Sequence, residues 1–175
     1  MPLHLDLDLA YESAGLPSSD AIQHWIERTI DSQSKHPAAK EDAEISIRIV
    51  DKAEISELNQ QYRNKVGPTN VLSFPCDLPE GVDVPLLGDI VISAPTVSEE
   101  AQAQSKTELA HWAHLLVHGT LHLLGYDHIT DEEATEMEQL EIQILQAFGY
   151  PDPYAPVQEI AQTDSHSHPL QPPSC

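Results

Sequence analysis

The stretch from Glu108 to Leu124 carries apolar residues at the spacing of one helix face. These residues are Leu109, Trp112, Leu115, Leu116 and Leu123. Gly125 follows directly, and glycine is the residue that most often ends a helix. A helix this apolar on one side must be covered by a sheet or by other helices, so the pattern predicts the central helix of a packed domain.

The other segments alternate between strand and helix patterns. Alternating or short continuous apolar runs predict strands over about 3–9, 45–49, 71–74 and 86–93. Helical spacing predicts helices over about 18–30, 52–63 and 131–148, and a long helical stretch after Pro95 with a break near Ser105. The expected architecture is mixed α/β, with about four strands in one sheet and helices packed against it.

Composition limits the partners and the compartment. The formal charge is −21, and no Lys or Arg lies beyond Lys106. An acidic surface repels polyanions, which argues against nucleic-acid binding and against DNA in particular. No transmembrane run, signal peptide or disulfide framework is recognisable, so we expect no membrane partner and a cytoplasmic, reducing location. From Tyr150 onwards the chain holds six of its 14 prolines, which predicts a disordered tail.

Three histidines carry the spacing of a metal site. His118 and His122 are four residues apart in HGTLHLLGYDH, so on a helix both imidazoles can reach one ion at about 2.0–2.1 Å. His128 follows after Gly125, where the chain can turn back, and can supply a third ligand. A pair at this spacing often arises by chance, and the third histidine is what favours a metal. Three protein ligands leave a position for water, as in catalytic zinc sites.

This spacing is that of the extended zinc motif of metzincin proteases, with one informative difference. Their general base, a Glu, is replaced by Gly119, which counts against a peptidase. His111 and His114 lie near the same helix face. They are interpreted as ordinary surface or partly buried residues, with an orienting role behind the ligands or a competing ligand pair as alternatives.

Beyond the histidines, three further blocks accompany HGTLHLLGYDH: LNQQYRNKVGPTNVLSFP (58–75), LLGDIVIS (86–93) and FGYPDPY (148–154). With these blocks the chain resembles the YbeY family of metal-dependent endoribonucleases. The resemblance implies an α+β, zincin-like fold with a mixed sheet and the metal site at the end of a central helix. It also implies a single YbeY-like domain over 1–154, which leaves 155–175 as a Pro-rich disordered tail.

The resemblance further implies single-strand-specific cleavage of RNA in 16S rRNA 3′-end maturation and in 70S ribosome quality control. The implied partners are rRNA and the small ribosomal subunit or its assembly proteins. The ligands carry over to His118, His122 and His128, and the functionally important arginine carries over to Arg63. The expected cofactor is one Zn²⁺, although three imidazoles also accept nickel, copper or iron. The family commonly has Asp at the position of Asn70, so one carboxylate near the expected site is lost.

The expected catalytic residues are Arg63 and His118. Arg63 can neutralise charge on the reacting phosphate, and Asp127 can orient a ligand or accept a proton, or simply form a turn. Arg48, Lys52, Arg63 and Lys65 are expected to form one positive cleft, with weak binding to free RNA. The alternatives are a hydrolase of another class, such as a peptidase or amidase, and a non-catalytic ribosome-assembly factor with a structural metal.

Overall fold

The computed structural model describes residues 3–13, 15–33, 43–67, 69–76, 86–127 and 129–154. Its elements in chain order are β1 (Leu3–Leu9), α1 (Ser19–Asp31), β2 (Ala43–Val50), α2 (Lys52–Arg63), β3 (Val71–Pro75), β4 (Leu86–Ser93), α3 (Ala94–Ala103), α4 (Glu108–Leu123) and α5 (Asp131–Ala147). The strands and helices predicted from the sequence are confirmed. The break near Ser105 is real, because Ser105 has a left-handed φ of 56° between α3 and α4.

The strands form one four-stranded mixed sheet in the order β1-β2-β4-β3. β1, β2 and β4 run parallel, and β3 pairs antiparallel with β4. The expected α+β fold with a mixed sheet is therefore confirmed. β3 is an edge strand of this sheet, so one side of its backbone faces away from the other strands.

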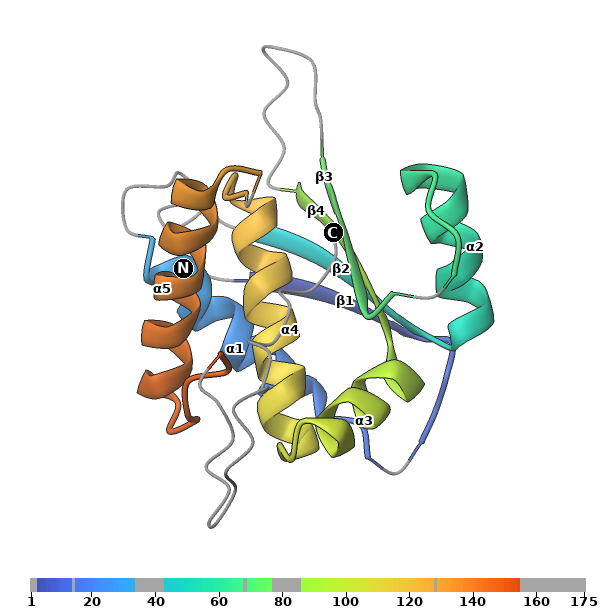
Figure 1. The fold of residues 1–175 in the computed structure, drawn as a ribbon, viewed down its shortest axis with the longest axis horizontal. Coiled ribbons are helices and arrows are strands. Elements are labelled where there is room, and N and C mark those ends of the chain that lie inside the picture. The colour runs from blue at the N-terminus through green and yellow to red at the C-terminus, as the bar shows by residue number, and fades with distance from the viewer. Residues whose placement is uncertain are drawn as a thin grey trace.

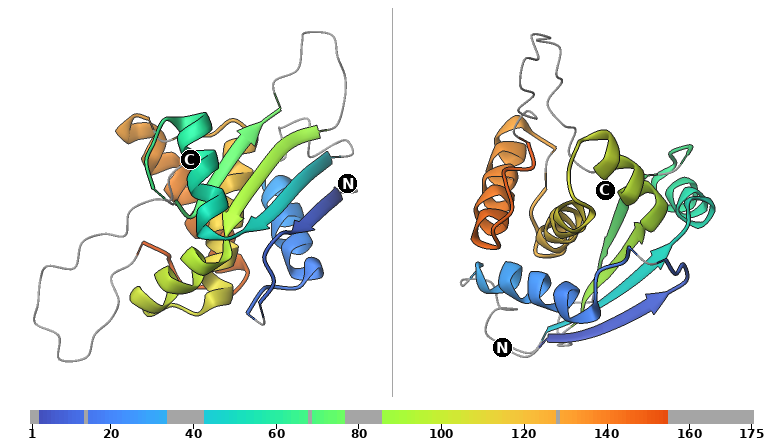
Figure 2. Two further views of the ribbon diagram at one scale, coloured as in Figure 1. Left: turned by 90° about the vertical axis from the view of Figure 1, so that its right-hand side faces the viewer. Right: turned by 90° about the horizontal axis from the view of Figure 1, so that it is seen from below.

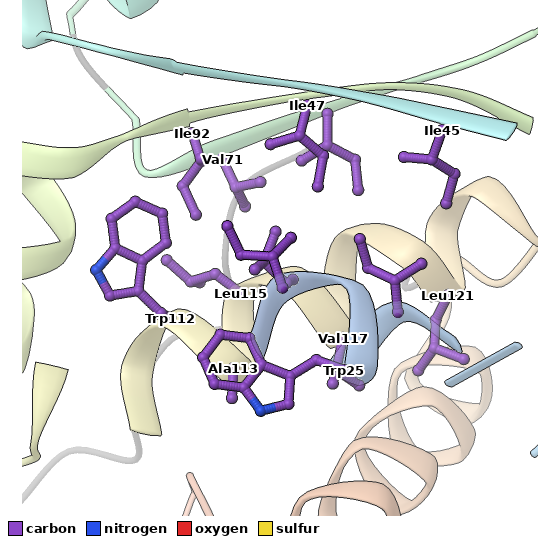
Figure 3. Packing of buried hydrophobic residues seen from close by; sticks show 14 of the residues in the cluster. Trp25, Ile45, Ile47, Val71, Ile92, Trp112, Ala113, Leu115, Val117 and Leu121 are labelled. Carbon is purple, nitrogen blue, oxygen red and sulfur yellow. The ribbon is translucent and has the colours of Figure 1, made fainter. Parts of the chain in front are cut away.

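Helices cover the two faces of the sheet unequally. α1, α4 and α5 lie on one face and α2 lies on the other, as Figures 1 and 2 show. On the first face, side chains such as Ile47 and Ile92 point at Leu115 of α4 (Figure 3). On the second face, Leu72 and Val91 form a smaller cluster with residues of and near α2.

α4 is the central helix of the larger layer. All residues from 111 to 121 are buried on it, between the sheet, α1 and α5. Trp112 and Leu115 are at most 1% exposed, and burial of such a side chain contributes roughly 1.5–3 kcal/mol. The prediction of a central helix is confirmed. Because residues 111–121 are packed on all sides, their side chains are held in place.

The chain stays packed beyond the end of α5, over residues 150–154. The ring of Tyr150 meets that of Trp25 edge-on, with centroids 6.5 Å apart, and Pro153 is buried. The prediction of a disordered tail from Tyr150 is therefore wrong for residues 150–154, where aromatic packing overrides the proline content. Residues 155–175, and with them the expected tail, lie outside the described residues. Within the described ranges, no helix has the length and apolar character needed to cross a membrane.

Candidate metal centre

Helix α4 ends in a turn that reverses the chain beside His122. Gly125 has a φ of +107°, a conformation that favours glycine. Its N–H donates to the carbonyl of His122 at 3.0 Å, and the N–H of Tyr126 donates to the carbonyl of Leu121 at 3.0 Å. These two bonds make a Schellman helix end. The prediction that Gly125 ends the helix and turns the chain is confirmed.

His118 and His122 face each other across one turn of α4. Their Nε2 atoms are 3.0 Å apart. The Nδ1 of His118 lies 2.7 Å from Oε2 of Glu141, and the Nδ1 of His122 lies 2.9 Å from the carbonyl oxygen of Tyr126. A carbonyl oxygen only accepts, so the Nδ1 of His122 carries a proton, and in the neutral ring the lone pair is then on Nε2. The structure thus brings the two rings to one point, and their binding of a metal remains a prediction.

This pair of rings fits the donor set of a divalent transition metal. Two nitrogens bound to one ion at about 2.0–2.1 Å with near-tetrahedral angles lie roughly 3.3 Å apart, close to the 3.0 Å between the Nε2 atoms. His128, the third expected ligand, lies outside the described residues. Among the residues that are described, no group of three or more His, Cys, Asp or Glu side chains could hold an ion. The described part of the site therefore supplies two of the three expected ligands.

A buried carboxylate lies directly behind His118. Glu141 of α5 is 0% exposed. Its Oε1 lies 2.9 Å from Nε2 of His114 and accepts a hydrogen bond from the hydroxyl of Tyr154. Burial alone would raise the pKa of Glu141, but hydrogen bonds from His114 and His118 outweigh burial and hold this pKa below its usual range. Burial lowers the pKa of His114 to about 4. At pH 7 an ionised Glu141 therefore faces a neutral His114.

His111 and His114 occupy buried positions, each 3% exposed. His114 shares Glu141 with His118, whereas Nε2 of His111 lies 2.8 Å from Oε1 of Glu100. The interpretation of both as surface or partly buried residues is wrong, because α4 is covered on every side at this level. The alternative of a place behind the expected ligands fits His114.

Arg63 is the last residue of α2 and lies against the edge strand β3. Its Nη2 donates to the carbonyl of Ser73 at 2.5 Å, and its guanidinium carbon is 5.2 Å from the centre of the Phe74 ring. Its Nε is buried without a hydrogen-bond partner in the described part of the chain. Ser73 also donates through Oγ to the carbonyl of Gly119 at 3.4 Å. Strand β3 thus connects Arg63 to the helix that carries the histidines.

The expected positive cleft is not formed as predicted. Arg48 is ion-paired with both Asp8 and Glu54, and Lys52 is 2.5 Å from a carboxylate oxygen of Glu99. These two cations are largely neutralised by carboxylates that the spacing of basic residues alone could not reveal. Lys65 is exposed. Of the four residues expected to form the positive cleft, Arg63 and Lys65 are the two that these ion pairs do not neutralise.

Close packing explains the glycine at position 119. A Cβ there would lie 3.1 Å from Oγ of Ser73 and 3.2 Å from Cδ1 of Ile90, which is tighter than ordinary van der Waals contact. Position 119 therefore faces β3 and β4, and the Glu that serves proteases as general base has no space. This observation strengthens the case against a peptidase.

Asn70 and Asp127 differ in how closely they approach the histidine pair. The amide of Asn70 donates to Oε1 of Glu100 at 3.1 Å, so Asn70 belongs with His111. By the helical rise, His111 lies about 10 Å along α4 from His118. The carboxylate that is lost at position 70 therefore does not lie beside the pair of His118 and His122, as the sequence led us to expect, but near His111. Asp127 is half-buried and directly follows Tyr126, whose carbonyl contacts His122.

Sequence reasoning missed Glu141 and Tyr154. The signal for Glu141 is a charged residue on the stripe of α5 that also carries Met137, Ile144 and Leu145, all of them buried. A charge at a core position of a helix needs partners, and the buried histidines of α4 are those partners. No comparable signal points to Tyr154, which lies in a proline-rich segment.

The fold and the histidine pair define an α+β protein with a candidate metal centre at the end of its central helix. Residues 10–149 match the family model described as endoribonuclease YbeY. The solution structure of TM1509 from Thermotoga maritima is similar, with 25% identity, a TM-score of 0.52, and coverage of 84% of this chain and 91% of that chain. The chain belongs to the YbeY family. This membership supports a metal-dependent endoribonuclease, a hydrolase that takes part in rRNA processing.

Proposed function

We propose that the chain is a zinc-dependent, single-strand-specific endoribonuclease that matures the 3′ end of 16S rRNA and acts in quality control of 70S ribosomes. The observation that carries this proposal is the pair of Nε2 atoms of His118 and His122, 3.0 Å apart, with the Nδ1 atom of each ring in contact with an oxygen. Together with family membership, this pair supports metal-dependent hydrolysis of RNA.

His118, His122 and His128 would hold the ion. When bound there, a divalent ion would supply Lewis acidity and would make water more acidic. The protein's part is to orient the rings. The carbonyl of Tyr126 fixes the ring of His122, and the carboxylate of Glu141 contacts the ring of His118.

Arg63 would bind the phosphate that is cleaved. One of its N–H groups is occupied by the carbonyl of Ser73, which leaves further donors of the guanidinium for a ligand. A guanidinium can contact two phosphate oxygens at once and offset the charge that develops during cleavage.

The charge distribution favours a substrate presented by a ribosomal particle. With Arg48 and Lys52 paired to carboxylates, few cations remain to neutralise phosphates. Phosphate contacts supply most of the sequence-independent affinity for RNA. We therefore propose weak binding to free RNA and dependence on the small ribosomal subunit or an assembly protein, in the cytoplasm.

The test compares cleavage of precursor 16S rRNA in ribosomal particles by the wild type and three variants. Arg63→Ala should lower the rate by about 10²–10³-fold with metal content unchanged, the usual loss when one charge-stabilising donor is removed. His122→Ala should lose both metal and cleavage. Arg28→Ala, which removes an exposed arginine from α1, on the sheet face opposite α2 and Arg63, is the matched control and should cleave normally.

Cleavage that survives in Arg63→Ala and His122→Ala would identify the nuclease as a contaminant. If the same two variants also support normal ribosome maturation in cells, the chain is a non-catalytic assembly factor. Hydrolysis of peptides or amides, abolished by His122→Ala, would instead place the chain in another class of hydrolase.

A further inference from the structure

Glu141 is a buried charge in the middle of an apolar helix face. Its neighbours on that face of α5, Met137, Ile144 and Leu145, are buried hydrophobic residues, and Glu141 itself is 0% exposed. A carboxylate is costly to bury unless hydrogen-bonded donors surround it. Since an apolar side chain would fill this position without that cost, the carboxylate points to a role beyond packing.

The two oxygens of Glu141 have different partners. Oε2 lies 2.7 Å from Nδ1 of His118. Oε1 lies 2.9 Å from Nε2 of His114 and accepts the hydroxyl hydrogen of Tyr154. His114 and Tyr154 thus occupy one oxygen from two sides, and the other oxygen is directed at the expected metal ligand.

We propose that Glu141 is the positioning residue of His118, and that Tyr154 keeps Glu141 in place. This inference rests on the proposed metal centre. A carboxylate that accepts from Nδ1–H leaves the lone pair on Nε2, which is the atom that faces His122 at 3.0 Å. The same contact fixes the rotation of the ring and makes Nε2 more basic, and both effects favour metal binding.

The two expected ligands on α4 are oriented in different ways. The partner of His122 is the backbone carbonyl of Tyr126, which the helix end places at 2.9 Å. The partner of His118 is a side chain from another helix. The orientation of His118 therefore depends on how α5 packs against α4, because the position of α5 sets where Glu141 contacts the His118 ring.

The segment after α5 secures the outer side of this arrangement. Tyr154 follows Glu141 by thirteen residues and returns to it, and the carbonyl of the preceding Pro153 accepts a hydrogen bond from Nζ of Lys106 at 2.9 Å. The N–H of Tyr154 also donates to Oδ1 of Asp152 at 2.8 Å. These contacts place the Tyr154 hydroxyl on Glu141, so metal affinity is coupled to this segment.

The experiment measures the zinc affinity of the full chain by competition with a chromogenic chelator. Glu141→Gln should bind zinc about 10–100-fold more weakly, the usual loss when a partner of a ligand histidine is changed. Tyr154→Phe should bind zinc roughly 2–10-fold more weakly, as expected for the loss of one hydrogen bond. Glu100→Gln alters the corresponding carboxylate beside His111 and should leave zinc affinity unchanged.

A second readout separates orientation from general destabilisation. The visible absorption bands of the cobalt(II) form should shift in Glu141→Gln and stay as in the wild type in Glu100→Gln. Wild-type affinity and an unchanged cobalt spectrum in Glu141→Gln would overturn the positioning role. Equal losses in Glu141→Gln and Glu100→Gln would overturn it too, because the effect would then come from stability.

Two further outcomes are decisive. If Glu141→Gln does not fold, Tyr154→Phe decides, and wild-type affinity in that variant overturns the proposal. If the wild-type chain binds no zinc or cobalt, the metal centre of the proposed function fails and this inference fails with it. Metal binding by the wild type and equally by Glu141→Gln removes only the positioning role.

Discussion

Gly125 and Gly149 offer a matched pair of substitutions that separates backbone strain from metal binding. Both have positive φ, +107° and +90°, and both follow the end of a helix. At both positions a Cβ would meet no atom within 4 Å. Replacement by alanine therefore introduces backbone strain at each site and no clash. Only the turn at Gly125 carries the carbonyl of Tyr126 to the ring of His122.

The expected loss of stability is similar for Gly125→Ala and Gly149→Ala. A left-handed conformation costs a residue with a Cβ about 1–2 kcal/mol, and the lower entropy of alanine in the unfolded chain offsets part of this. We expect a net loss of about 1 kcal/mol, which lowers the midpoint of thermal unfolding by roughly 2–4 °C in a domain of this size. Circular dichroism of the metal-free proteins measures it.

The two variants should differ in metal affinity. Relaxation of the strained turn at Gly125 moves the carbonyl that fixes His122, so Gly125→Ala should bind zinc about 10–100-fold more weakly. Gly149→Ala carries the same kind of strain at the end of α5, and its turn leads into the segment that holds Tyr154 on Glu141. Its zinc affinity should therefore fall by no more than the roughly 2–10-fold expected for loss of that one hydrogen bond. Equal zinc affinity in the two variants would refute the reasoning, since the turn would then have no part in orienting the ligand.

Three further predictions concern packing and ionisation. Gly119→Ala should lower the free energy of unfolding in urea by about 1–3 kcal/mol, because the new methyl group presses on Ser73. This loss outweighs a gain in helix propensity of up to about 1 kcal/mol. Unchanged stability would contradict the close contact. Leu115→Ala should lower the free energy of unfolding by about 2–5 kcal/mol. Leu109 is 48% exposed on the same helix, so Leu109→Ala should lower it by less than about 0.5 kcal/mol. Similar losses in the two variants would exclude α4 as the core helix. Burial lowers the pKa of Lys106 from 10.5 to about 8, so between these pH values the folded chain binds fewer protons than the unfolded chain, and the free energy of unfolding should rise with pH. Lys106→Met should flatten that rise. An equal slope of unfolding free energy against pH in both proteins would contradict the burial of Lys106.

The sequence was informative wherever a local pattern decides the structure. Strand alternation, helix spacing and the glycine at 125 predicted the elements and the turn because each depends on neighbouring residues. The facing of His118 and His122 follows from their separation of four residues on a helix. These features need no knowledge of how the elements pack together.

The failures concern contacts between distant segments. The carboxylates that neutralise Arg48 come from β1 and α2, and no pattern in the sequence shows which carboxylates will reach it. The burial of His114 depends on α5, and the packing of residues 150–154 depends on α1 and α5. Glu141 was readable only as a charge on a buried stripe, whose partners became visible once the two helices were placed side by side.

The metal content of the purified, untagged chain and of two histidine variants tests the metal centre most directly. Elemental analysis after dialysis should find about one transition-metal ion per chain in the wild type and in His4→Ala, whose histidine is exposed on β1. His122→Ala should retain almost none and remain folded. A wild type without bound metal, or a His122→Ala variant with the wild-type content, would contradict the assignment of the paired histidines.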